Sequence, residues 1–281
     1  MTTWLITGSS SGIGRCVAEH LLRDGHRVAA TARDPERLAN LAQRHGERLW
    51  TGALDVTDAE AVRTTVDRAF AELGRIDVVF SNAGYGHIGS AEEVSEAEIA
   101  RQLDTNLRGP IHLTRAVLPH LRAQGGGRIV QMSSMGGQVV FAGSSLYHAA
   151  KWGVEGFFET VAREVAQFGI EITLVEPGGV PTGFLGSSLA VAASMDEYGN
   201  GPVADLRRRI GELRDAERGH GSDLGKVADA IVGSTAGPAP LRLILGTDAY
   251  EAIHGALSDR LAVVTAQRAL AASTDSHSSR S

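Results

Sequence analysis

The 281-residue chain is poor in the residues that mark secreted, membrane-spanning or metal-binding proteins. Its single cysteine, Cys16, excludes an internal disulfide framework and is typical of a reducing compartment, so we expect a cytoplasmic protein. No apolar run approaches the roughly 20 residues that cross a bilayer, and no charged and apolar leader precedes the first strand-like segment, so we expect no membrane partner. The ten histidines have neither paired Cys/His spacing nor a His-Glu-x-x-His motif, which predicts no metal site.

An excess of positive charge is missing as well. The chain has 27 basic and 33 acidic residues and a formal net charge of -6, whereas binding to nucleic acid requires a basic surface. We therefore expect no nucleic-acid partner. The hydrophobic fraction of 43% and the charged fraction of 21% are ordinary for a globular protein, and we expect one domain over residues 1–281.

What the sequence does contain is an alternation of short apolar runs with longer amphipathic segments. We expect strands at residues 4–7, 27–31, 49–55, 77–81, 128–132, 171–175 and 241–246. We expect helices at residues 15–23, 35–45, 58–73, 95–122, 146–168 and 223–235. Strands that alternate with helices are joined by right-handed crossovers. The expected fold is therefore α/β: a single doubly wound parallel sheet of about seven strands with helices on both faces.

Two segments depart from this alternation. Residues 183–221 form a connection much longer than is needed, and connections of this length are usually functional, so we expect a substrate lid there. Its apolar part, residues 184–193, would close over the substrate, and the basic residues 207–209, which have acidic neighbours, predict a solvated helix face. Residues 273–281 are rich in serine, and we expect a flexible tail.

A glycine-rich turn joins the first expected strand to the first expected helix, with the sequence Thr7-Gly8-Ser9-Ser10-Ser11-Gly12-Ile13-Gly14. Glycines allow the backbone to turn sharply and to approach a pyrophosphate, whose charge faces the N-terminus of the following helix. A tight turn that binds nothing is the alternative for such a segment alone. Its position between a strand and a helix favours dinucleotide binding.

Four more motifs follow in order, at strand ends or on helices. They are Ser81-Asn82-Ala83-Gly84, then Asn106, then Ser133-Ser134 with Tyr147-x-x-x-Lys151, and finally Pro177-Gly178 through Thr182. With these motifs the chain resembles the short-chain dehydrogenases/reductases in their single-domain, Rossmann-like form, over about residues 3–182. Within that family it is most similar to the 17β-hydroxysteroid-dehydrogenase-like branch. Ser81 departs from the family pattern, which has asparagine there.

The chemistry of the Tyr147 and Lys151 pair can also be argued from the residues themselves. Because they are four residues apart, they share one helix face. A free phenol has a pKa of about 10, but an ammonium group one turn away, together with oxidised nicotinamide, lowers the pKa of the phenol. Ser134, at the C-terminal edge of the sheet, can hydrogen-bond a substrate carbonyl oxygen as negative charge develops on it. A helix-face pair without catalytic function is the alternative for Tyr-x-x-x-Lys alone.

The resemblance implies further roles. It implies that Asn106 holds a water molecule that continues the proton path from Lys151 to solvent. It also implies a nicotinamide dinucleotide bound along the C-terminal edge of the sheet, although Asp55 could instead be a turn residue. The cofactor-binding residues expected on this basis are Gly8, Ser10, Gly12, Ile13, Gly14, Arg33, Asp55, Val56, Asn82, Ala83, Gly84, Tyr147, Lys151, Pro177, Gly178, Val180 and Thr182.

The end of the second expected strand favours NADP (NADPH) over NAD. A carboxylate at this position would bind the ribose 2′-hydroxyl and repel a 2′-phosphate, but the chain has Ala32 there. Arg33 offers a planar, bidentate donor for the phosphate, and Ser10 can add a hydroxyl group. A solvated surface arginine is the alternative for Arg33.

These motifs predict an NADPH-dependent oxidoreductase that interconverts a ketone and a secondary alcohol, a ketoreductase in the reducing direction. No lysine or arginine occurs in residues 133–146 or 183–206, so we expect a small-molecule substrate that is bulky and apolar. Imine reduction, epimerisation or dehydration on the same frame remain alternatives, as does a non-catalytic NADP-binding regulator. His148 points about 100° away from Tyr147 around the helix, and we expect no catalytic role for it.

The resemblance also implies a homodimer or homotetramer that pairs helices 95–122 and 147–168 across a twofold axis. We expect Trp152, Phe157, Phe158 and Val161 to supply the apolar centre of that interface, unless they pack on the sheet instead.

Overall fold

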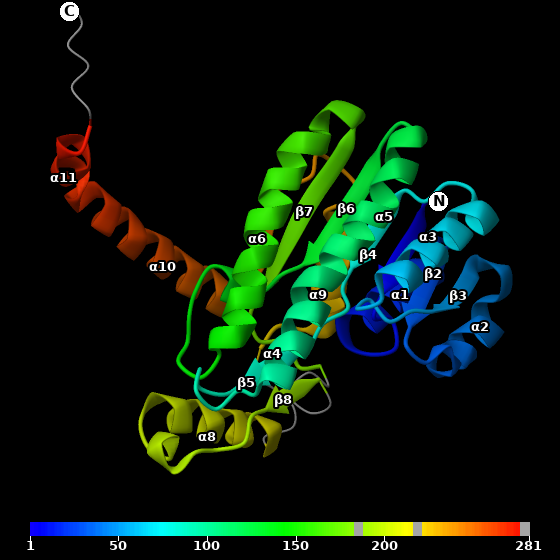
Figure 1. The fold of residues 1–281 in the computed structure, drawn as a ribbon. Coiled ribbons are helices and arrows are strands. Elements are labelled where there is room, and N and C mark those ends of the chain that lie inside the picture. Colours follow the sequence, from blue (N-terminus) through cyan, green and yellow to red (C-terminus); the bar gives the residue numbers. More distant parts are fainter. Residues whose placement is uncertain (183–187, 216–220, 276–281) are drawn as a thin grey trace, which may run out of the picture.

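The central sheet of the computed structural model is parallel throughout (Figure 1). The structure describes residues 1–182, 188–215 and 221–275. Within them, seven strands pair in the order β3-β2-β1-β4-β6-β7-β9. Their bounds are Thr3–Thr7 (β1), Arg27–Ala32 (β2), Leu49–Ala53 (β3), Val78–Ser81 (β4), Gly127–Met132 (β6), Ile170–Pro177 (β7) and Arg242–Leu245 (β9). The strand order reverses between β1 and β4, the position where ligands bind in open α/β sheets.

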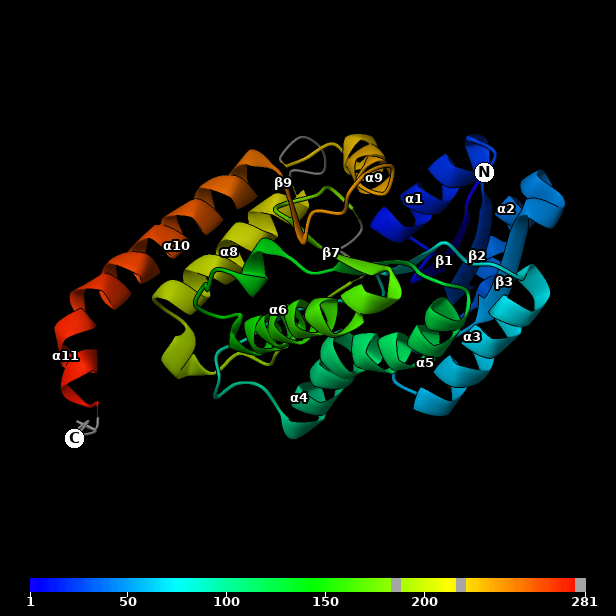
Figure 2. The ribbon, with the colours of Figure 1, turned by 90° about the horizontal axis from the view of Figure 1, so that it is seen from above.

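Helices cover both faces of this sheet (Figure 2). On one face, α1 (Gly12–Arg23), α2 (Ala39–His45) and α9 (Leu224–Gly233) pack on Trp4 and Ile6 of β1. On the other face, α3 (Ala59–Leu73), α5 (Gly109–Ala123) and α6 (Ser145–Val165) pack on Leu5. Successive residues of β1 thus enter opposite cores, because side chains alternate along a strand. The expected doubly wound sheet of seven strands is confirmed.

The single helix expected over residues 95–122 has an irregular centre. The structure has α4 (Glu96–Leu103), one π-helical turn at Asp104–Arg108, and then α5. Ser95 and Glu98 form a capping box at the start of α4, which fixes where the helix begins. A π-helical turn inserts an extra residue into a helix and often marks a functional position. Here it contains Asn106.

The expected lid contains regular structure in its described part. β8 (Leu189–Val191) pairs in parallel with β5 (Gly86–Ile88) outside the main sheet, and α8 (Pro202–Asp215) follows it. Arg207 of α8 forms an ion pair at 2.8 Å with Glu93, whose side chain is fully buried. The solvated face expected at residues 207–209 is therefore wrong for Arg207. Residues 183–187 and 216–220 of the expected lid lie outside the described residues, and motion of the lid stays a prediction.

The C-terminal segment forms a long helix that the sequence patterns did not predict. α10 (Thr247–Ala266) and the short α11 (Arg268–Ser273) extend away from the sheet (Figure 1). Large apolar side chains on α10, including Leu257, Leu261 and Val264, are exposed. Because they are four and three residues apart, these three side chains lie on one face of α10. None of the described helices combines the length and apolar character of a membrane span. Residues 276–281 of the expected tail lie outside the described residues.

Two of the aromatic and aliphatic residues expected at a subunit interface belong to the interior. Phe158 is fully buried and Val161 is 5% exposed, and both pack in the core between α6 and the sheet. Phe157 is half-buried against the same core, whereas Trp152 is 41% exposed. For Phe158 and Val161, packing on the sheet is therefore the correct alternative.

Candidate active site

Three of the expected catalytic side chains lie together at the C-terminal end of β6. Ser134 follows this strand, and α6 carries Tyr147 and Lys151 one turn apart. The Ser134 side chain forms a hydrogen bond with that of Tyr147. The Lys151 Nζ atom lies 5.8 Å from the centroid of the Tyr147 ring and donates a hydrogen bond of 3.0 Å to the Met132 carbonyl. A serine hydroxyl, a phenol and an ammonium group are thus held by one strand end and one helix.

Burial acts on the proton affinities of both α6 residues. It raises the pKa of Tyr147, and the hydrogen bond with Ser134 opposes this effect. It lowers the pKa of Lys151 to about 8, while the Glu155 carboxylate acts in the opposite direction. The protein's own groups therefore do not lower the pKa of Tyr147. The lowering expected from Lys151 together with oxidised nicotinamide stays a prediction.

His148 fastens the loop that follows Ser134. Its Nδ1 atom lies 2.8 Å from the Gly136 carbonyl oxygen, and the Phe141 amide donates to its Nε2 atom at 2.9 Å. One nitrogen faces an acceptor and the other a donor, which requires the neutral ring with hydrogen on Nδ1. Burial lowers the pKa of His148 and so favours that form. The structure gives His148 a positioning function, which the sequence analysis did not identify.

The glycine-rich turn has the shape of a phosphate cradle. Gly8 and Gly12 have φ angles of +69° and +57°, which favour glycine. α1 begins at Gly12, its first turn contains no acidic residue, and the side chain of Ser11 does not cap it. The amides at the start of α1 can therefore meet an anion without competition from a carboxylate, and a dinucleotide pyrophosphate fits this position.

Asn82 locks the glycine-rich turn to the end of β4. Its Nδ2 atom donates to the Thr7 carbonyl at 3.0 Å and to the Gly8 carbonyl at 3.2 Å. A Cβ atom on Gly14 would lie only 2.4 Å from Nδ2 of Asn82, and one on Gly8 would lie 2.9 Å from Cα of Ala83. Gly8 and Gly14 are therefore required by the packing of two strand ends as well as by any ligand.

Asn106 locks the next turn of the chain in the same way. Its Oδ1 atom accepts from the Tyr85 amide at 3.0 Å, and its Nδ2 atom donates to the Tyr85 carbonyl at 2.6 Å. A Cβ atom on Gly84 would lie 3.0 Å from Oδ1 of Asn106. The side chain thus holds the segment after β4 in place. The water-holding role that the resemblance implies for Asn106 stays a prediction.

The segment after β7 closes the other side of the cradle. A Cβ atom on Gly12 would lie 3.6 Å from Cβ of Thr182, so Thr182 lies opposite the glycine-rich turn. Asp248, at the start of α10, accepts from the Gly179 amide at 2.7 Å, and a Cβ atom on Gly178 would lie 2.2 Å from its carboxylate oxygens. Val180 packs beside the core of the α1 face. Asp248 is a positioning residue that the motifs did not reveal.

Two expected cofactor contacts at the ends of β2 and β3 differ in their environment. Arg33 is exposed and has no hydrogen bond or ion pair with other described residues, whereas nearby Arg15 is tied to Glu19, the Arg37 carbonyl and Asn40. Arg33 thus has a free guanidinium among the described residues at this end of the sheet. Asp55 accepts hydrogen bonds from the amide and hydroxyl of Thr57, as a turn residue would, and Val56 packs against Gly109. Ser10 and Ile13 are half-buried in the glycine-rich turn.

A groove of about 680 Å³ lies between the loop after Ser134 and α8. Its lining combines apolar residues with charged ones. The lining residues are Val140, Phe141, Ala142, Pro202, Asp205, Leu206, Arg208, Arg209 and Glu212. Arg208 and Arg209 lie outside residues 133–146 and 183–206, the two segments that contain no basic residue. Arg208 pairs with Asp205 at 2.6 Å.

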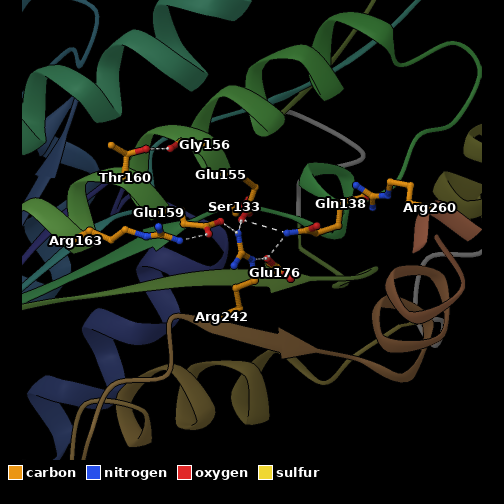
Figure 3. A network of polar contacts seen from close by, with 10 residues as sticks. All are labelled: Ser133, Gln138, Glu155, Gly156, Glu159, Thr160, Arg163, Glu176, Arg242 and Arg260. Carbon is orange, nitrogen blue, oxygen red and sulfur yellow. Dashed lines mark hydrogen bonds and ion pairs between the residues drawn. The ribbon is translucent and has the colours of Figure 1, made fainter. Parts of the chain in front are cut away.

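A network of charged side chains that the motifs did not include joins α6, β7 and β9 (Figure 3). Glu155 of α6, Glu176 of β7 and Arg242 of β9 meet there, with Ser133 and Gln138 as hydrogen-bond donors. Both glutamates, Glu155 and Glu176, are buried, which is unusual because acidic side chains are mostly exposed. In residues 1–182, 188–215 and 221–275, no cluster of three metal-binding side chains occurs.

Comparisons with known proteins agree with this arrangement. The model of the family described as short chain dehydrogenase matches residues 2–191. An oxidoreductase of Botryotinia fuckeliana, BOA17, is 41% identical over 249 residues, which cover 88% of this chain and 90% of that protein. A short-chain dehydrogenase from Streptomyces avermitilis has a TM-score of 0.90 and 36% identity, with 98% of this chain and all of that chain covered.

A more distant structure carries a cofactor analogue. An alcohol dehydrogenase from Thermococcus sibiricus, complexed with 5-hydroxy-NADP, has a TM-score of 0.71 and 26% identity, over 88% of this chain and 97% of that one. Other structural neighbours, with 23% to 25% identity, are complexes with NADP+, NAD or NADH. Nicotinamide dinucleotides are thus the cofactors bound by the similar structures.

Proposed function

The chain belongs to the short-chain dehydrogenase family, and from this premise we propose that it is an NADPH-dependent oxidoreductase that interconverts a ketone and a secondary alcohol. The family membership makes it an oxidoreductase that acts on CH–OH or C=O groups with a nicotinamide cofactor. The preference for NADPH, the roles of individual residues and the substrate are the proposed part.

The position of Ser134 at the end of β6, next to Tyr147 and Lys151 on one face of α6, carries this proposal. A bound reduced nicotinamide would supply the hydride that the carbonyl carbon receives in reduction. Ser134 donates a hydrogen bond to the carbonyl oxygen as negative charge develops there. Tyr147 gives its phenolic proton to that oxygen, and the Lys151 ammonium stabilises the phenolate that is left. Oxidation of the alcohol reverses each of these steps.

The cofactor preference is supported by the charge at the end of β2. The pyrophosphate would lie at the start of α1, whose first turn has no acidic residue and no side-chain cap. Arg33 is exposed and unpaired among the described residues, and the buried Ala32 offers no carboxylate to repel a 2′-phosphate. The bidentate geometry of a guanidinium fits that phosphate. Asn82, Ala83, Gly84, Pro177, Gly178, Val180 and Thr182 would form the nicotinamide side of the site.

For the substrate we propose a bulky, mainly apolar ketone or alcohol. Val140, Phe141 and Leu206 line the groove beside the catalytic loop and support this choice. Arg209 also lines this groove and could attract a carboxylate. Ketones that carry a carboxylate therefore test the preference for an apolar substrate. A panel of cyclic and aromatic ketones, each with a matched keto acid, should give higher kcat/KM for the uncharged member of each pair. Higher values for the keto acids would refute the apolar substrate.

The decisive experiment follows deuterium from 4-deuterated NADPH into the product alcohol of this panel. Net reduction places one deuteron on the carbinol carbon and consumes one NADPH for each alcohol formed. Epimerisation would consume no NADPH. A non-catalytic regulator would bind NADPH and turn over no member of the panel. Tyr147 and Lys151 are both present, which favours an enzyme over such a regulator.

We also propose a homodimer or homotetramer in the cytoplasm. Trp152 on α6 and the apolar side chains of the protruding α10 are exposed, as the surface of a subunit contact would be in an isolated chain. Light scattering at micromolar concentration should give a mass of two or four chains. A mass of one chain, 29.6 kDa, would refute the oligomer.

A further inference from the structure

Figure 3 shows three charged side chains that meet, Glu155 of α6, Glu176 of β7 and Arg242 of β9. Glu155 lies one helical turn beyond Lys151 on α6. Arg242 of β9 pairs with Glu155 at 3.2 Å and with Glu176 at 3.1 Å. The side chain of Glu176 is fully buried and that of Glu155 is 7% exposed. One guanidinium is thus shared by two buried carboxyl groups, which cannot both be ionised without repulsion.

The two carboxyl groups differ in their hydrogen-bond partners. Glu155 accepts a short hydrogen bond from the Ser133 hydroxyl and a longer one of 3.4 Å from Gln138. Glu176 accepts from Gln138 at 3.2 Å, but its second oxygen has no partner among the described residues. Burial, followed by repulsion from Glu155, raises the pKa of Glu176 to about 7. The raised pKa of Glu176 favours its protonated form, in which one carboxyl oxygen needs no cationic partner.

Lys151 needs a negative charge nearby. Its ammonium group is buried, and it contacts a neutral acceptor, the Met132 carbonyl, rather than a carboxylate. A buried ammonium without an opposing charge loses its proton more easily. Glu155 is four residues further along α6, on the same helix face, and its charge opposes the effect of burial on Lys151.

We propose that Glu155 is a positioning residue of the reaction: its buried charge keeps Lys151 protonated, and its bond to Ser133 fixes the strand end that carries Ser134. The second part follows from the sequence, because Ser133 is bonded directly to Ser134 in the chain. Lys151 and Glu155 thus hold two successive residues of that strand end, Met132 and Ser133. The catalytic consequence rests on the proposed function, whereas the effect on Lys151 does not.

Other charged and titratable groups lie on the elements packed around α6. Most of them are paired with one another: His87 of β5 with Glu98 of α4, and Asp104 with Arg108 in the π-helical turn. Arg260 of α10 lies over the Trp152 ring and donates to the Gln138 carbonyl. Further titratable groups on α6 and in the ion-pair network are Tyr147, His148, Glu155, Glu159, Glu176 and Arg242. Among them, Glu155 is the one whose charge acts on the pKa of Lys151.

The chain allows a direct test, because it contains only two lysines, Lys151 and Lys226. Protein labelled with ¹³C at the lysine ε-carbon gives two signals, and their pH titration reports the two ammonium groups separately. The variant Glu155→Gln keeps the size and the hydrogen-bond acceptor but removes the charge. The pKa of Lys151 should fall by roughly one unit or more in this variant, while that of Lys226 should not move.

Matched variants separate charge from packing. Glu159→Gln removes another carboxylate that pairs with Arg242, at 2.8 Å, and should leave the Lys151 titration unchanged. Glu155→Asp restores the charge and should return the pKa of Lys151 towards the parent value. Ser133→Ala removes the hydroxyl and keeps the charge, so it should lower kcat without moving the Lys151 titration. If Glu155→Gln does not fold, the double variant Glu155→Gln, Arg242→Gln removes both partners of the ion pair and should show the same fall.

The same variants are then compared in ketone reduction. The rate at alkaline pH should decline as Lys151 loses its proton, and in Glu155→Gln this decline should begin at lower pH by the shift measured for Lys151. An unchanged or raised pKa of Lys151 in Glu155→Gln would overturn the inference, whatever the activity. If the pKa falls but no ketone is reduced by the parent protein, the proposed function fails and the electrostatic role of Glu155 stands.

Discussion

The two halves of the motif-bearing region, residues 1–81 and 82–182, bury different kinds of polar side chain. In residues 1–81, which contain the glycine-rich turn and Arg33, every buried polar residue is a serine or a threonine. In residues 82–182, which contain Ser134 and Tyr147, the buried set also includes carboxylates and bases. These charged or titratable residues are His87, Glu93, Arg128, His148, Lys151, Glu155 and Glu176.

This difference separates binding from chemistry. A pyrophosphate can be held by backbone amides and a helix N-terminus, so the first half needs no ionisable group in its interior. Proton transfer requires groups whose charge is set by burial and by neighbours, and the second half contains them. The first half should therefore govern which dinucleotide binds, and the second half should govern turnover and pH dependence.

The largest expected effect comes from Tyr147→Phe, which removes the proton donor and almost no volume. Turnover should fall by about 10²- to 10⁴-fold, the range that one proton donor contributes. The Kd for NADPH, measured by nucleotide fluorescence, should stay near that of the parent because the cradle in the first half is unchanged. Turnover close to the parent value would contradict the proposed mechanism.

Arg33→Ala tests the first half in the converse way. A charge-assisted contact contributes about 1.5–3 kcal/mol, so the KM for NADPH should rise by about 10- to 100-fold. The KM for NADH and the kcat with either cofactor should change little. Arg44→Ala, on α2, is the control and should leave both KM values in place. An equal rise for NADPH and NADH would show that Arg33 does not bind the 2′-phosphate.

Gly14→Ala tests whether the cradle is also a structural joint. The added Cβ atom would lie 2.4 Å from Asn82 and 2.6 Å from the Gly8 carbonyl oxygen, so we expect a loss of about 1–3 kcal/mol of unfolding free energy. Gly211→Ala is the control, because nothing lies within 4 Å of a Cβ atom there and the residue is inside α8. That change should be neutral or stabilise by up to about 1 kcal/mol. Urea denaturation of both variants measures the contrast.

The smallest expected effect concerns acid stability, which the comparison assigns to the second half. Burial alone would raise the pKa of Glu93, but hydrogen bonds from Ser90, Met195 and Arg207 together lower it to about 2. A lowered pKa in the folded state stabilises the fold at neutral pH, and this contribution is lost as the pH falls from about 5 towards 2.

Glu93→Gln should therefore make the urea midpoint less dependent on pH over that range. Glu92→Gln, which changes an exposed neighbour, should retain the parent's dependence. Identical pH profiles for Glu93→Gln and the parent would place the acid sensitivity elsewhere.

The elements of the sheet and the positions of the motif residues could be predicted from the sequence, whereas the cluster of buried charged residues could not. The strands and helices are indicated by apolar periodicity, which is a local property of the sequence. The alternation of strands and helices then predicts that the motif residues lie at strand ends. Glu155, Glu176 and Arg242 come from three elements spread over 88 positions of the chain, so no local pattern indicates that they meet. Arg207 was misread for the same reason, because its partner Glu93 lies on a distant segment. In α10, by contrast, Leu257, Leu261 and Val264 recur at helical spacing, so a local pattern was available from which this helix could have been predicted.

The close packing of Gly14 against Asn82 affects how catalytically inactive relatives of such enzymes can be recognised. A descendant that had lost all affinity for dinucleotides would still need hydrogen at position 14, because a methyl group there would collide with the amide of residue 82. The glycine motif would then be retained after the activity was lost, and a pseudoenzyme would still contain the motif of an active enzyme. The Tyr147 hydroxyl is a better sign of a working catalyst, since the sheet does not depend on it. In a pseudoenzyme it is therefore the group expected to disappear first.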